Sequence, residues 1–135
     1  MNKAKKFFAV LIVLLCTLSA GCSVGNGYKT ISANDAMKIM QTAGDYIILD
    51  VRTQAEFDKK HIPGALLLPI ADIREGKFDK IPDKNQMLLL YCWTGRRAED
   101  SAKILAENGY TNVYTFGGLV DWDGALVGAD IDDNN

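Results

Sequence analysis

One segment, residues 87–109, restricts the fold more than any other part of the chain. Met87–Tyr91 is a short, continuous apolar run, which is typical of a buried strand in a parallel sheet. Residues 98–108 carry apolar side chains at helical spacing and end at Gly109, a residue favoured just after a helix. The loop between them starts at Cys92, which therefore lies where open α/β sheets bind ligands.

The loop sequence indicates a reactive sulfur at Cys92. It reads Cys92, Trp93, Thr94, Gly95, Arg96, Arg97. The free N–H groups at the start of the following helix and the two arginines would stabilise a thiolate and attract an anion. The alternative is an inert core cysteine, which is common for this residue type. The glycine and the paired arginines favour a nucleophile.

Strand and helix patterns alternate along the rest of the chain. We predict further strands at 46–49, 66–68 and 112–116, and helices from Ser32 to Gly44, from 54 to 60 and from 70 to 74. Strands that alternate with helices predict an α/β fold, with a central parallel sheet and helices on both faces. One domain of this kind would cover residues 31–129, followed by a polar tail at 130–135.

The N-terminus has the pattern of an export signal. Three lysines precede the apolar run Phe7–Leu15, which is too short to span a bilayer, since that needs roughly 20 residues. Residues 18–22 resemble the lipobox of bacterial lipoproteins, although Ser19 replaces the usual large aliphatic residue. We predict a signal peptide at 1–21, a lipid anchor at Cys22 and a short tether over 22–30. The alternative is an ordinary cleaved signal in which Cys22 has no role.

The cysteine count limits the chemistry further. Of three cysteines, Cys16 would leave with the signal and Cys22 would carry lipid, so Cys92 would be the only free thiol. A structural disulfide is then excluded. His61 is the only histidine, so a cysteine-based zinc site is excluded too. We also expect no other metal and no cofactor. A dithiol redox enzyme would need a resolving cysteine, and none remains.

The charge balance restricts the partners. The chain has 15 Lys and Arg against 17 Asp and Glu, and the signal would remove three lysines, leaving a net charge of −5. This balance disfavours nucleic acid and an anionic membrane surface. We expect membrane attachment through the N-terminal lipid alone, and a monomer.

Three groups of residues, in this order along the chain, resemble the rhodanese-like sulfurtransferase domains. The first is Asp50-Val51-Arg52 with Glu56-Phe57 and His61–Ala65, the second is Cys92–Ala98, and the third is Gly117-Gly118 with Trp122. The resemblance covers about residues 31–127. It implies a rhodanese-like fold and a double displacement in which Cys92 takes sulfur from an anionic donor such as thiosulfate. The resulting persulfide would pass its sulfur to a thiol or to cyanide.

Two alternatives to this activity follow from the same family. Related phosphatases and arsenate reductases place an arginine after five intervening residues, a position held here by Ala98, whereas Arg97 follows after four. The shorter loop favours sulfur transfer over phosphatase activity. The other alternative is a non-catalytic sulfur carrier or binding module that holds a persulfide for a membrane partner.

The loop residues fit the physical needs of this chemistry. Gly95 would let the N–H groups of the loop, including that of Thr94, converge on the sulfur. Arg97 would orient the donor or brace the loop, and Arg96 would contact the donor's sulfonate or be a solvated surface charge. Trp93 would shield the persulfide or favour an apolar acceptor; equally, it could pack on its own domain.

Four residues outside the loop have structural interpretations, in some cases beside functional ones. Asp50 and Arg52 follow a strand at the sheet edge that carries Cys92, where we favour a bracing ion pair over substrate contact. His61 is expected to anchor a turn rather than to transfer protons. Trp122 is expected to pack as core.

Overall fold

The computed structural model of the protein describes residues 27–130. Its elements in chain order are β1 (Lys29–Thr30), α1 (Ala33–Thr42), β2 (Tyr46–Asp50), α2 (Gln54–Lys59), β3 (Leu66–Leu67), α3 (Ile70–Arg74), β4 (Met87–Cys92), α4 (Arg96–Glu107), β5 (Val113–Gly118) and the 3₁₀ helix η1 (Leu119–Asp121). The signal peptide, Cys22 and most of the tether and tail predicted above lie outside the described residues.

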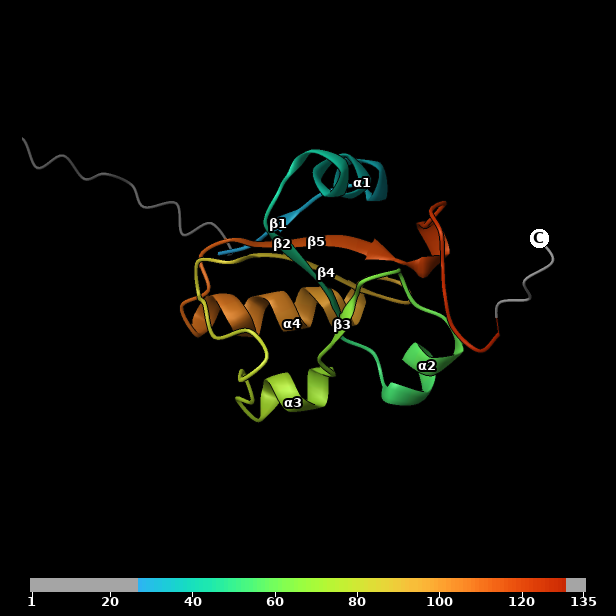
Figure 1. Ribbon diagram of the computed structural model, residues 1–135. Helices are drawn as coiled ribbons and strands as arrows, with labels where there is room; N and C mark the ends of the chain where they lie inside the picture. The colour runs from blue at the N-terminus through green and yellow to red at the C-terminus, as the bar shows by residue number, and fades with distance from the viewer. Residues whose placement is uncertain (1–26, 131–135) are drawn as a thin grey trace, which may run out of the picture.

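The strands form a single parallel sheet in the order β1-β5-β4-β2-β3 (Figure 1). The predicted α/β fold with one parallel sheet is therefore confirmed. Strand β4, an unbroken run of apolar residues, lies at the centre because both of its faces are covered. Parallel strands end at the same edge, so β2 and β4 bring Asp50 and Cys92 to one side of the sheet.

Alternate residues of β4 supply two separate layers of core. Leu88, Leu90 and Cys92 pack with α3 and α4, whereas Leu89 and Tyr91 pack with α1 and η1. Figure 1 shows α1 on one side of the sheet and α3 and α4 on the other. Helices thus cover both faces, as predicted, and Cys92 points to the α4 side.

Some element boundaries differ from the predicted ones. Lys29 and Thr30, placed in the tether, form β1 because they pair with Tyr114 and Thr115 of β5. Helix α4 begins at Arg96 rather than at residue 98, because its first turn is set by the loop conformation and not by apolar spacing. Strand β5 continues through Gly117 to Gly118, with a register shift against β4 near Cys92.

Helix length and hydropathy also bear on membrane contact. Within residues 27–130, no helix is long and apolar enough to cross a membrane.

Candidate active site

Cys92 is the last residue of β4 and is almost completely buried, with 1% of its surface exposed. Its Sγ accepts a hydrogen bond from the backbone N–H of Gly95 at 3.0 Å. Gly95 is the N-cap residue of α4, so the helix N-terminus is directed at the sulfur. Hydrogen-bond donors and a helix dipole placed in this way stabilise a negatively charged sulfur. The loop backbone therefore contacts the sulfur of Cys92, a side chain that also packs in the core layer beside α4.

Two glycine-dependent contacts fix the loop. Gly95 has a φ of +102°, a conformation that favours glycine, and a Cβ there would also lie 3.1 Å from the Cα of Gly117. A Cβ on Gly118 would overlap the carbonyl of Trp93 and lie 2.7 Å from the nitrogen of Thr94. The end of β5 thus packs backbone to backbone against the loop, and the Val120 N–H donates to the Trp93 carbonyl at 3.2 Å.

Arg97 is held by a carboxylate from another element. Its Nη1 and Nη2 donate to the two oxygens of Glu56 in α2, at 2.8 and 2.7 Å. These hydrogen bonds lower the pKa of Glu56 to about 2, against its partial burial. The same bonds raise the pKa of Arg97, and the neighbouring Cys92 sulfur adds to that effect. Glu56 therefore holds Arg97 in a two-pronged pair at the start of α4.

Behind the loop, Asp50 and Arg52 form a fully buried ion pair. Arg52 donates to the Asp50 carboxylate through its backbone N–H, Nε and Nη2, with the Nη2 bond at 2.7 Å. Burial lowers the pKa of Arg52, but the hydrogen bonds and charge of Asp50 more than offset this, so the net shift is upward. Tyr91 lies beside this pair, and burial together with the Asp50 charge raises its pKa. The Tyr91 hydroxyl accepts the buried N–H of Ile62 at 3.1 Å.

The other loop residues lie at the surface. Thr94 and Arg96 are exposed, and Trp93 is exposed over 40% of its surface. The Nζ of Lys60, the residue after α2, lies 5.0 Å from the centre of the Trp93 ring. The structure thus buries Cys92 and Gly95, leaves Arg97 partly exposed beside them, and places Trp93 and Arg96 at the surface.

His61 and Trp122 lie outside the loop. The His61 ring stacks on Phe57 with centroids 3.6 Å apart, its Nδ1 is 2.7 Å from the Phe57 carbonyl oxygen, and its backbone pairs with Val127. Trp122 is partly buried against Phe116, and its Nε1 donates to the carbonyl of Ala125.

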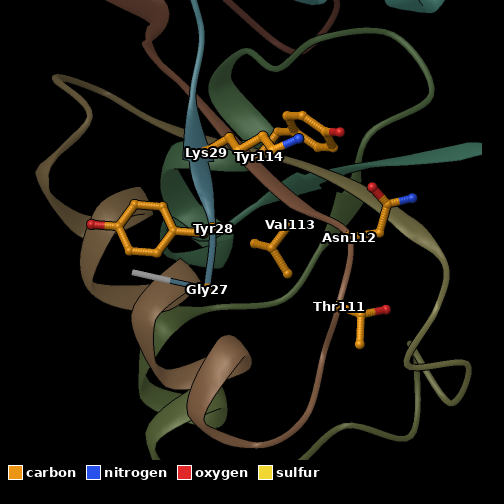
Figure 2. A pocket seen from close by; sticks show the side chains of 7 residues that line it. All are labelled: Gly27, Tyr28, Lys29, Thr111, Asn112, Val113 and Tyr114. Atoms are coloured by element: carbon orange, nitrogen blue, oxygen red, sulfur yellow. The ribbon is translucent and has the colours of Figure 1, made fainter. Parts of the chain in front are cut away.

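A separate pocket of about 350 Å³ lies at the start of β1 and β5, lined by residues 27–29 and 111–114 (Figure 2). Strand β5 reaches Cys92 only at its far end, at Gly118, so this pocket is not part of the cysteine site. Its lining contains no cysteine and no carboxylate. Across residues 27–130, no three His, Cys, Asp or Glu side chains lie close enough to hold a metal ion.

The site therefore consists of a buried cysteine at the end of a central strand, a helix N-terminus beside its sulfur, and an arginine held by a glutamate. This arrangement agrees with the rhodanese-like class of α/β domains. The family model for the rhodanese-like domain matches residues 32–125, and the chain belongs to this family.

Two bacterial relatives show the similarity at the sequence level. Thiosulfate sulfurtransferase PspE of Escherichia coli is 37% identical over 73 residues, which cover 54% of this chain and 70% of the relative. Thiosulfate sulfurtransferase GlpE of Coxiella burnetii is 34% identical over 96 residues, covering 70% of this chain and 87% of the relative. Among solved structures, an E. coli rhodanese with anions superposes with a TM-score of 0.57 at 33% identity, covering 62% of this chain and 99% of that one.

Sequence reasoning left three features of the site out. The sequence pattern predicts neither the pairing of Glu56 with Arg97 nor the contacts of Lys60 and Gly118 with the loop. Glu56 and Arg97 are 41 positions apart, so no local pattern links them. Of these residues, only Gly118 had a local signal of close backbone packing, because it is one of two adjacent glycines at the end of a strand.

Proposed function

We propose that the protein is a rhodanese-type sulfurtransferase that uses thiosulfate or a similar anionic donor. The Cys92 thiolate attacks the outer sulfur of thiosulfate, the sulfur–sulfur bond of the donor breaks, and sulfite leaves with the electron pair. Cyanide or a thiolate then attacks the outer sulfur of the persulfide, which regenerates the Cys92 thiolate. No oxidant or reductant is consumed beyond the donor and the acceptor.

The observation that carries this proposal is the contact between the Gly95 N–H and the Cys92 sulfur at 3.0 Å. The loop and the helix N-terminus support negative charge at the sulfur, which both the attacking thiolate and the departing one require. Arg97, placed by Glu56, adds a positive charge on the same side. The names of the relatives at 34–37% identity support the same donor.

The location is a further part of the proposal. The basic and apolar pattern of residues 1–21, followed by Cys22, supports export and lipid attachment. We propose that the domain works outside the cytoplasm, tethered to a bacterial membrane. Metabolic labelling with a fatty acid would mark the protein but not Cys22→Ser, and equal labelling of the two would refute the anchor.

Turnover distinguishes an enzyme from a sulfur carrier. Thiocyanate released from thiosulfate and cyanide is measured for the protein and for Cys92→Ser. Steady release by the protein alone supports the enzyme. A persulfide that persists in the presence of cyanide and free thiols, with no release, would instead support a carrier that needs a specific partner. Equal release by both proteins would refute a role for Cys92.

A further inference from the structure

The cations around the loop differ in how far a carboxylate neutralises them. Arg97 gives both of its terminal nitrogens to Glu56, and Arg52 is bound by Asp50 in the interior. Each guanidinium thus has a carboxylate beside it, which partly offsets its charge toward an incoming anion. The donor of the proposed reaction carries a sulfonate-like end, which needs a cation that is still available.

Two cations at the surface around the loop have no carboxylate partner and are available to an anion. In the part of the chain that the structure describes, Arg96 and Lys60 have no carboxylate within 4.0 Å. Arg96 belongs to the loop and projects from the first turn of α4 as an exposed side chain. Lys60 comes from a different segment, 32 positions before Cys92, and the loop motif does not include it.

The placement of Lys60 is determined by three separate contacts. Its backbone N–H donates to the Glu56 carbonyl at the end of α2, and its own carbonyl accepts Nη2 of buried Arg52 at 2.7 Å. The C-terminal segment closes over it, since the Asp130 N–H donates to the Lys59 carbonyl and a Cβ on Gly128 would lie 2.7 Å from the Cα of Lys60. The backbone of Lys60 is therefore fixed relative to the site.

The side chain of Lys60 extends from this fixed point to the loop. It is half-buried, and its ammonium lies over the Trp93 ring at 5.0 Å from the ring centre. A lysine over an indole keeps its N–H donors on the side away from the ring, where an anion can reach them. Trp93 directly follows Cys92, so the ammonium lies at the rim of the reactive loop.

We infer that Lys60, held over Trp93, binds the anionic end of the sulfur donor and so sets the affinity of the enzyme for thiosulfate. This inference rests on the proposed function, because it assigns the binding of that donor. It gives Trp93 a role as the platform for the cation. Arg97, in contrast, is a positioning residue for the loop.

Equilibrium binding separates this inference from the activity itself. Binding of thiosulfate is measured by titration calorimetry on Cys92→Ser protein, which cannot take up sulfur, with Lys60→Met, Lys60→Arg or Lys59→Met added. Methionine keeps much of the apolar length over Trp93 and removes the charge. Lys59 is the matched control, because it is exposed and its ammonium makes no cation–π contact in the described part of the chain.

We expect Lys60→Met to raise the Kd for thiosulfate about tenfold, the loss of one charge-assisted hydrogen bond. Lys60→Arg should restore the Kd to within about twofold, and Lys59→Met should leave it unchanged at that level. In the active protein, Lys60→Met should raise KM and leave kcat nearly unchanged. Thermal unfolding of each variant shows that the fold is retained.

Two results would overturn the inference. One is an equal Kd for Lys60→Met and Lys59→Met, and the other is a Lys60→Arg variant that is folded but still binds as weakly as Lys60→Met. The proposed function fails differently, through the absence of sulfur transfer from thiosulfate in the protein with Cys92 intact. Weaker binding by Lys60→Met would then still establish the anion site.

Discussion

Replacement of Glu56 by glutamine tests how Arg97 is held at the loop that follows Cys92. Oε2 of Glu56 accepts from the Thr53 backbone and hydroxyl as well as from Arg97, whereas Oε1 accepts from Arg97 alone. A glutamine oxygen at the Oε2 position keeps the cap of α2. Its NH₂ group then faces Nη2 of Arg97, so one hydrogen bond and the ionic component are lost.

The magnitude follows from the exposure of this pair. The side chains of Glu56 and Arg97 are 36% and 34% exposed, so solvent screens much of their attraction. With good two-pronged geometry, we expect Glu56→Gln to lower the free energy of unfolding by about 1 kcal/mol. In a domain of this size that corresponds to a decrease in Tm of roughly 4–8 °C.

The effect of Glu56→Gln also has a defined pH dependence. The pKa of Glu56 is lowered from 4.5 to about 2, so its stabilisation is fully present above about pH 4.5 and is lost as the pH falls through about 2. Glutamine does not titrate. The difference in Tm between the protein and Glu56→Gln should therefore be largest near neutral pH and should shrink steadily between pH 4.5 and 2.

The assay is thermal unfolding followed by circular dichroism at pH 7, 4, 3 and 2. The control is Glu75→Gln, which removes an ion pair with Lys77 in which both side chains are more than half exposed. We expect the control to change Tm by less than about 2 °C at any pH. The reasoning is refuted if Glu56→Gln matches this control, or if its Tm difference at pH 3 and below equals that at pH 7.

Three further substitutions test the packing around the site. Gly118→Ala places a Cβ on the carbonyl of Trp93. It should lower the free energy of unfolding, measured with urea, by about 1–3 kcal/mol and lower the rate of sulfur transfer at least tenfold. A stable variant with full activity would show that the loop does not depend on this contact. Arg52→Met leaves the buried Asp50 carboxylate unpaired and should cost about 3–5 kcal/mol by the same measurement, and a loss under about 1 kcal/mol would contradict the burial of that pair. Tyr91→Phe leaves one buried N–H without an acceptor and should cost about 1–3 kcal/mol, whereas a neutral result would mean that another group accepts it.

The sheet was largely predictable because its inner strands are buried on both faces. Continuous apolar runs at β2 and β4 indicate such strands without any knowledge of their partners. Strand β1 was not predictable in this way, since Lys29 and Thr30 are exposed and form a strand only because β5 supplies the pairing. The strand propensity of Lys29 and Thr30 does not reveal that β5 is available to pair with them.

In the candidate site, too, the features with local sequence signals were predictable and those that depend on tertiary contacts were not. Cys92 and Gly95 were predictable, because a strand, a glycine and a helix start are local signals. The pairing of Glu56 with Arg97 and the position of Lys60 over Trp93 depend on how α2 packs against the loop, which follows from tertiary structure alone. The sequence therefore predicts the loop around Cys92, but neither the pairing of Arg97 with Glu56 nor the position of Lys60 over Trp93.

Intact-mass analysis tests the central claim of a persulfide on Cys92 most directly. The protein is incubated with thiosulfate, measured, and measured again after cyanide is added. We predict a gain of about 32 Da, the mass of one sulfur atom, that cyanide removes and that Cys92→Ser never shows. No gain from thiosulfate or from any other persulfide donor, in protein shown to be folded, would contradict sulfur transfer by this site.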